Sequence, residues 1–169
     1  MKVLKFGGTS VANSKNLTNV LKIVQKQKYP IAVVVSALGG ITDLLMDMLS
    51  LAQSGDDNYK NHLPLVEKRH LETIKSCVPI QHQSAIISFL KKHLNELESR
   101  LDAIHLLEEA TPKNNAAISA YGELLSSNII QEIFSFNGID SVHKDSRDLI
   151  TTLHHNGREV VDQLTSEDN

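Results

Sequence analysis

The chain has 169 residues, enough for one domain with a substantial core, and its composition (41% hydrophobic, 22% charged) is that of a folded protein. A formal net charge of -3 and an aromatic fraction of only 4%, with no Trp, give no reason to expect nucleic acid or an anionic membrane as a partner. No apolar run is long enough to span a bilayer or act as a signal peptide, and the only cysteine, Cys77, cannot form an internal disulfide or a zinc cluster, so we expect a cytoplasmic protein without a metal site.

The beginning of the chain predicts a strand, a helix and a second strand. Residues 2–6 form a short apolar run that stops at Gly7-Gly8. Apolar residues then recur at helical spacing over 17–24, and Asn13 or Ser14 can cap such a helix. The run 31–35 is apolar and β-branched without a break, which is typical of a strand buried on both faces of a parallel sheet. Together these segments predict a βαβ unit.

Longer helical patterns occupy most of the remaining chain. Apolar residues at helical spacing predict helices at about 42–52, 59–77, 80–108 and 115–136. Gly138 closes the last of them, and the two central ones predict a helical hairpin. Alternation over 139–143 predicts a third strand, and a short helix is predicted at about 157–164. The polar tail, 165–169, is expected to be disordered.

The order of these elements predicts an α/β fold with a mainly parallel sheet and helices on both faces, giving three layers (αβα). Three strands are few for so many helices. The predicted sheet is therefore unfinished, which indicates a truncated domain.

A small-residue turn follows the first predicted strand. Gly7 and Gly8 let backbone N–H groups come close to an anion, and the N-terminus of the next helix adds a favourable dipole. Lys5, at the end of the strand, can place a positive charge on phosphate oxygens. The alternative is a plain tight turn beside a solvated lysine, and the turn alone does not decide between the two.

A second glycine pair, Gly39-Gly40, follows the second predicted strand, with hydroxyl groups at Ser36 and Thr42 that suit a carboxylate or a phosphate. The alternative is that Thr42 or Asp43 only caps the next helix. Because the carboxyl ends of neighbouring parallel strands lie at one edge of a sheet, we expect both turns to open into one cleft.

A third segment, 119–126, places small residues and Gly122 inside a predicted helix, at a cost in helix propensity. A glycine there favours close packing or the close approach of a ligand. Glu123, next to it, can accept hydrogen bonds from a substrate ammonium group, or it is an ordinary exposed glutamate.

The segments 5–12, 34–43 and 119–126 together resemble the sequence motifs of aspartate kinases, members of the amino-acid kinase family. Their order and rough spacing agree, and the resemblance runs from residue 1 to about 162. It implies the amino-acid kinase (carbamate kinase-like) fold, with residues 1–164 as the N-terminal portion only of that domain, truncated before the sheet is complete. Residues 67–70 and the long helical hairpin are most similar to bifunctional enzymes in which homoserine dehydrogenase follows the kinase.

The resemblance implies that ATP, supplied with Mg, phosphorylates the β-carboxylate of L-aspartate to 4-phospho-L-aspartate, the first step of lysine, threonine and methionine biosynthesis. It implies that Lys5 stabilises charge on the transferred phosphoryl group. The implied nucleotide site consists of Lys5, Gly7, Gly8, Thr9 and Ser10, and the implied aspartate site of Ser36, Thr42 and Glu123. We also expect a homo-oligomer.

The chain lacks the later Gly-Arg-Gly-Gly-Ser-Asp segment of aspartate kinases, their adenine pocket and their regulatory ACT domains. We therefore expect the isolated chain to bind aspartate weakly and not to turn over. Two alternatives stay open: a non-catalytic amino-acid-binding or assembly module with the same fold, and a kinase acting on another substrate such as glutamate or uridylate.

Two charged groups need a separate explanation. Glu67 and His70 lie at i, i+3, as in some di-iron bundles, but no second Glu-x-x-His occurs, so we predict solvated helix residues. Asp145, Arg147 and Asp148 resemble a family segment that shapes the substrate cleft or a subunit contact, and a charged loop that stabilises itself explains them equally well.

Overall fold

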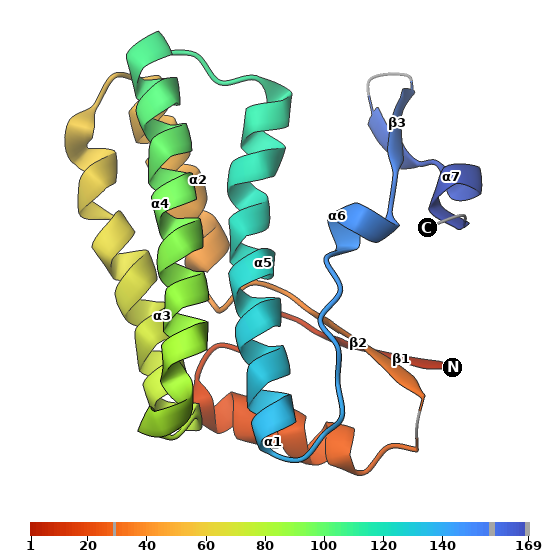
Figure 1. Ribbon diagram of the computed structural model, residues 1–169. Coiled ribbons are helices and arrows are strands. Elements are labelled where there is room, and N and C mark those ends of the chain that lie inside the picture. Colours follow the sequence, from red (N-terminus) through yellow and green to blue (C-terminus); the bar gives the residue numbers. More distant parts are fainter. Residues whose placement is uncertain (29, 156–157, 168–169) are drawn as a thin grey trace.

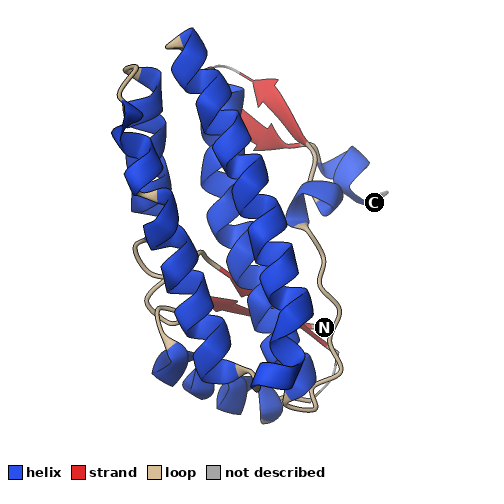
Figure 2. Ribbon diagram, turned by 60° about the vertical axis from the view of Figure 1, so that its left-hand side comes forward, coloured by secondary structure: helices blue, strands red, loops and turns tan. Residues whose placement is uncertain are grey.

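The computed structural model describes residues 1–28, 30–155 and 158–167 of the chain. Long helices stand side by side, and a short helix and a two-stranded sheet lie across their lower end in the view of Figure 1. A second, separate two-stranded sheet lies to one side of the long helices, and Figure 2 shows the two sheets well apart. None of the helices in the described ranges has the length and apolar character that crossing a membrane requires.

The predicted βαβ unit is confirmed. Strand β1 (Lys2–Phe6) pairs in parallel with β2 (Ile31–Val35), and helix α1 (Ser14–Gln25) connects them. Asn13 caps α1 by accepting a hydrogen bond from the backbone N–H of Asn16.

Burial of the strands differs from the prediction. On one face of the sheet, Leu4, Phe6, Val33 and Val35 pack against the core. On the other face, Val3 and Val34 are 59% and 47% exposed, beside Lys5, which pairs with Val34. The prediction that the second strand is buried on both faces is therefore wrong for the described part of the chain, because no described element covers this second face.

The long helices agree closely with the predicted ones. They are α2 (Ile41–Gln53), α3 (Leu63–Cys77), α4 (Gln83–Leu107) and α5 (Pro112–Phe136), with 3-10 turns η1 (Asp57–Asn61) and η2 (Ile80–His82) between them. Their apolar faces supply most of the core. Nine of the fully buried side chains are Leu45, Met48, Val66, Ile74, Leu90, Leu97, Leu101, Leu125 and Ile129.

The prediction that His70 is solvated is wrong, because its side chain is 0% exposed. Nδ1 donates a hydrogen bond of 2.7 Å to the carbonyl oxygen of Val66, one turn earlier in α3, so this nitrogen is satisfied within the helix. Nε2 is buried and has no hydrogen-bond partner among the described residues. Glu67, on the same helix, is ion-paired with Lys91 of α4.

The predicted strand at 139–143 is not formed. The segment runs beside α5 and is held by side chains of that helix instead of by a ladder with another strand. Gln131 Nε2 donates to the carbonyl oxygen of Ser141, and Ser127 Oγ and His143 Nε2 lie 2.9 Å apart, at hydrogen-bond distance.

The end of the described chain also differs from the prediction. After a short helix α6 (Ser146–Leu149), β3 (Thr152–His155) and β4 (Arg158–Val161) form an antiparallel pair where a helix was predicted at 157–164. Valine and threonine in these segments favour strands. Helix α7 (Gln163–Glu167) then occupies part of the tail expected to be disordered, whose last two residues, 168–169, lie outside the described ranges.

Helix α7 has a local physical explanation. Asp162 accepts hydrogen bonds from the backbone N–H and the hydroxyl group of Thr165, at 3.3 and 2.6 Å, and so caps the helix. Ser166 Oγ accepts a hydrogen bond from the backbone N–H of Thr151, which ties the helix to the preceding hairpin.

Candidate functional site

The first loop, residues 7–13, joins β1 to α1, and hydrogen bonds accepted by its backbone carbonyl groups hold its shape. The N–H of Ser10 donates to the carbonyl oxygen of Gly7 at 2.9 Å, and Asn16 Nδ2 donates to that of Thr9 at 2.6 Å. Val11 is 0% exposed and anchors the loop in the core. Within the described ranges the backbone N–H groups of Gly8 and Thr9 have no hydrogen-bond acceptor, so they are available to an anion.

The second loop, residues 36–40, joins β2 to α2 and continues the sheet. The N–H of Ser36 donates to the carbonyl oxygen of Phe6, and Ala37 and Leu38 are buried. Gly40, at φ 81°, is the N-cap of α2, and no side chain caps this helix. The alternative explanation for Thr42, that it caps the helix, is therefore wrong, and its side chain is exposed on the first turn.

The two loops touch through their glycines. A Cβ atom on Gly8 would lie 3.2 Å from the carbonyl oxygen of Ala37, and one on Gly39 would lie 2.9 Å from the Cβ of Ala12. Side chains at these glycines would push the loops apart. The two turns thus meet at one edge of the sheet, and glycine is required by the closeness of the two backbones. That they open into one cleft stays a prediction.

The third motif lies on α5 and packs directly on the second loop. A Cβ atom on Gly122 would lie 2.7 Å from the Cβ of Ala37, so this glycine serves close packing. Glu123 Oε1 accepts a hydrogen bond of 3.2 Å from the backbone N–H of Ala37. Ser126, which is fully buried, donates from Oγ to the carbonyl oxygen of Ser36 at 2.8 Å.

The three motifs therefore converge around Ala37 although they are far apart in the sequence. Glu123 places an exposed carboxylate there, oriented by its bond to the loop. Beside it, the first loop offers unpartnered N–H groups next to the N-terminus of α1. A carboxylate and an anion-binding loop at adjacent positions suit a ligand with an ammonium group and a second one with phosphate groups.

Two of the predicted site residues stand apart from this cluster. Lys5 lies on the uncovered face of the sheet and is exposed. Thr42 lies on the first turn of α2. Neither side chain forms a hydrogen bond or an ion pair with Glu123 in the part of the chain that the structure describes. Also within that part, no group of three or more His, Cys, Asp or Glu side chains could hold a metal ion.

Sequence reasoning missed three contacts that hold the site. They are made by Asn16 to Thr9, by Ser126 to Ser36 and by Arg69 Nη2 to the carbonyl oxygen of Ala12, at 2.8 Å. Ser126 belongs to the third motif, so the motif itself was a signal for it. The sequence around Arg69 and Asn16 contains no comparable signal, because their acceptors are backbone carbonyl groups.

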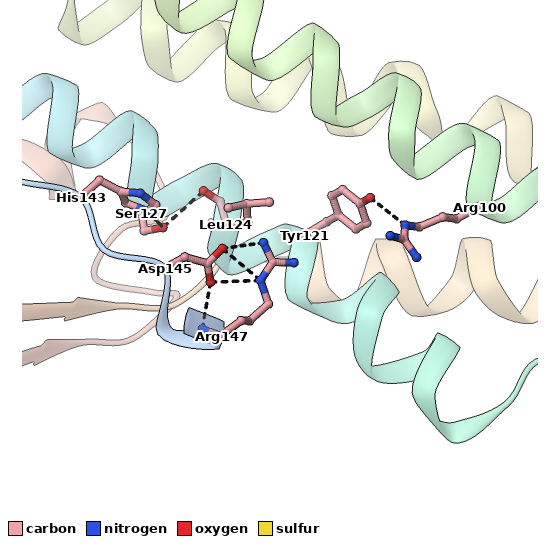
Figure 3. A network of polar contacts seen from close by, with 7 residues as sticks. All are labelled: Arg100, Tyr121, Leu124, Ser127, His143, Asp145 and Arg147. Atoms are coloured by element: carbon pink, nitrogen blue, oxygen red, sulfur yellow. Dashed lines mark hydrogen bonds and ion pairs between the residues drawn. The ribbon is translucent and has the colours of Figure 1, made fainter. Parts of the chain in front are cut away.

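A second polar network follows the other side of α5 (Figure 3). Arg147 donates to both carboxylate oxygens of Asp145, and these hydrogen bonds hold the pKa of Asp145 below its usual range. Asp145 also caps α6. Further along α5, Arg100 Nε donates to the hydroxyl oxygen of Tyr121 at 3.0 Å. The geometry favours the explanation that the charged loop at 145–148 stabilises itself.

Comparison with known proteins shows which family and which proteins this chain is similar to. The profile described as "Amino acid kinase family" matches residues 1–167. The chain is 30% identical over 159 residues to the chloroplastic bifunctional aspartokinase/homoserine dehydrogenase 1 of Arabidopsis thaliana, covering 94% of this chain and 18% of the relative. It is 34% identical over 151 residues to the aspartokinase of Chlamydia pneumoniae, covering 89% of this chain and 31% of the relative.

The chain belongs to the amino acid kinase family. The crystal structure of aspartokinase III of E. coli, in complex with aspartate and ADP, superposes with a TM-score of 0.87 at 23% identity, over 99% of this chain and 36% of that chain. This likeness shows the fold and confirms the predicted class. The chain thus spans about a fifth to a third of the length of these curated relatives.

Proposed function

We propose that the protein carrying this chain is an aspartate kinase, which transfers the γ-phosphoryl group of ATP to the β-carboxylate of L-aspartate and yields 4-phospho-L-aspartate. The observation that carries the proposal is the Glu123 carboxylate, fixed on the second loop beside the glycine-rich first loop. Relatives named aspartokinase and bifunctional aspartokinase/homoserine dehydrogenase support it, and so do the aspartate and ADP bound in the E. coli complex.

Aspartate is expected to bind at the second loop and the third motif. In this proposal the Glu123 carboxylate pairs with the substrate ammonium group, and the hydroxyl groups of Ser36 and Thr42 donate to a substrate carboxylate. The support from geometry is that Glu123 and Ser36 are held together by Ala37 and Ser126. The exposed position of Thr42, which has no capping role, leaves its hydroxyl group available.

The phosphates of ATP are expected to bind at the first loop, through the N–H groups of Gly8 and Thr9, with Gly7 and Ser10 completing the loop. Lys5 supplies a positive charge that stabilises the phosphoryl group as it is transferred in line, without a covalent enzyme intermediate. Mg, arriving with the nucleotide, supplies further charge neutralisation on the phosphates. The protein's part in this reaction is to orient both substrates and to donate hydrogen bonds to developing negative charge.

The proposal extends to the pathway, the assembly and the location of the protein. They are a role at the start of lysine, threonine and methionine biosynthesis, a homo-oligomer and a location in the cytoplasm, with neither nucleic acid nor a membrane as partner. The Arabidopsis thaliana relative is named as chloroplastic, so localisation of a tagged full-length protein is the test of the cytoplasmic location.

The test is ADP release by the full-length protein with ATP and aspartate, measured with a coupled assay. We expect activity that requires both substrates, and at least a hundredfold loss in Lys5→Ala, because the lysine acts on the transition-state charge. Lys75→Ala, which removes an exposed lysine from α3, is the matched control and should behave as the unaltered protein.

Activity with glutamate or uridylate, and none with aspartate, would show that the proposed substrate is wrong. A folded protein that binds aspartate without any phosphoryl transfer would overturn the enzyme assignment in favour of an amino-acid-binding module.

A further inference from the structure

We propose that Arg69 is a positioning residue that holds the first loop in the shape in which it binds phosphate groups. The inference rests on the proposed function for its kinetic part. Its basis in the structure is a single long-range contact, in which Arg69 Nη2 on α3 donates a hydrogen bond of 2.8 Å to the carbonyl oxygen of Ala12 at the end of the loop, 57 positions away in the sequence.

This contact differs in kind from the others that shape the loop. The carbonyl groups of Gly7 and Thr9 are satisfied by Ser10 and Asn16, which belong to the loop and to the helix that follows it. Those bonds fold the loop upon itself and can move with it. The bond from Arg69 fixes the end of the loop to the helical bundle.

Ala12 is also one of the points where the first loop meets the second loop. Its Cβ lies so close to Gly39 that a Cβ atom there would be 2.9 Å away. Arg69 therefore holds Ala12 from the carbonyl side while Gly39 bounds its methyl group. Displacement of Ala12 would change the spacing between the loop proposed for the nucleotide and the loop proposed for aspartate.

Arg69 itself projects from a well-fixed base. Val66, His70 and Ile74, on the same helix, are all 0% exposed. Thr73 donates from Oγ to the carbonyl oxygen of Arg69, and the Glu67–Lys91 ion pair links this turn of α3 to α4. Arg69 is half-buried, and its guanidinium group is thus presented by a rigid helix, as precise positioning requires.

Arg69 acts through a backbone carbonyl group and is not proposed to touch either substrate. Its removal should therefore loosen the first loop while the cluster of Glu123, Ala37 and Ser36 stays intact. The two effects can therefore be measured separately: kcat/KM for ATP should fall, and KM for aspartate should stay the same.

The experiment compares Arg69→Met, which keeps the aliphatic stem and removes every donor, with Arg69→Lys, which restores a charged donor, in the full-length protein. The control is Lys68→Ala, since this neighbouring lysine is 73% exposed and its one ion pair among the described residues is with Glu72, at 4.0 Å. For Arg69→Met we expect kcat/KM for ATP to fall roughly tenfold to a hundredfold, the range for a lost charge-assisted hydrogen bond. KM for aspartate should stay within about twofold, Arg69→Lys should recover most of the loss, and Lys68→Ala should be unchanged.

A second readout does not depend on activity. Amide hydrogen exchange at residues 7–13 should become faster in Arg69→Met, while exchange in α5 stays the same. Unchanged exchange and unchanged kcat/KM for ATP would overturn the proposal, as would an equal rise of both KM values. If the unaltered protein has no aspartate kinase activity, the proposed function fails, and the exchange measurement alone then decides the role of Arg69.

Discussion

Glu123 and Ala37 are joined by a hydrogen bond of 3.2 Å between Oε1 of the glutamate and the backbone N–H of the alanine, 86 positions apart in the sequence. The bond sets the direction of a carboxylate that is otherwise exposed. Because an amide oxygen can accept the same hydrogen bond, the charge of this side chain can be removed while its orientation is kept.

Glu123→Gln is expected to weaken aspartate binding without loosening the site. The amide keeps an oxygen for the N–H of Ala37 but lacks the negative charge proposed to pair with the substrate ammonium group. KM for aspartate should rise roughly tenfold or more, while the melting temperature changes little. Glu132→Gln, on the same helix, is the control, and equal effects of the two substitutions would contradict the proposed role of Glu123.

Gly122→Ala is expected to destabilise the fold. The added methyl group would lie 2.7 Å from the Cβ of Ala37, and overpacking of this kind outweighs the gain in helix propensity. We expect the free energy of unfolding in urea to fall by about 1–2 kcal/mol. Gly7→Ala is the matched control, since a Cβ atom there meets nothing within 4 Å, and it should leave stability unchanged or slightly raised.

His70 is expected to make stability depend on pH. Burial lowers its pKa from 6.5 to about 4, so between these values the unfolded chain binds a proton that the folded protein does not. The free energy of unfolding should therefore rise as the pH increases from about 4 to 6.5, by up to about 3 kcal/mol, and this contribution should be constant above that window.

The measurement for His70 is urea unfolding across this pH range, for the unaltered chain and for His70→Leu. The difference between the two isolates this histidine from the other titrating groups. A His70→Leu variant with the same pH dependence as the unaltered chain would show that His70 is not the source.

Tyr59→Phe, in the 3-10 turn η1, is expected to destabilise the protein slightly. The ring of Tyr59 is 1% exposed, and its hydroxyl group donates to Asp102 Oδ1 at 2.5 Å. Because Asp102 is exposed, water can replace the lost donor, so we expect a loss of only about 1 kcal/mol in urea unfolding. A loss above about 3 kcal/mol would indicate that the ring packing had changed as well.

The sequence sufficed for those parts of the fold that are determined locally. The strand at 2–6, the helix after Asn13, the strand at 31–35 and the long helices follow from apolar spacing and from glycine. The glycine pairs also located the two turns, although the contact between their backbones was seen only in the structure. These signals lie within a few residues of the features that they predict.

The features that were missed depend on partners elsewhere in the chain. Residues 139–143 alternate as a strand does, but a strand needs a neighbour, and here α5 occupies that side with polar side chains. His70 looks polar in sequence, yet a bond to Val66 within its own helix satisfies Nδ1 and permits burial. Arg69 lies in the segment 67–70 that resembles bifunctional enzymes, but nothing in the sequence indicated its contact with the loop, because its acceptor is a carbonyl group that any residue at position 12 would provide.

Ala37 contacts both other motifs: its N–H donates to Glu123 and its methyl group lies against Gly122, both in the third motif, and its carbonyl oxygen lies against Gly8 in the first. The space between positions 37 and 122 therefore has room for one methyl group, which either residue can supply. Such a pair should evolve jointly. The double exchange Ala37→Gly with Gly122→Ala should recover much of the stability that Gly122→Ala loses alone, so that a substitution harmful in one lineage becomes acceptable in another with the complementary partner.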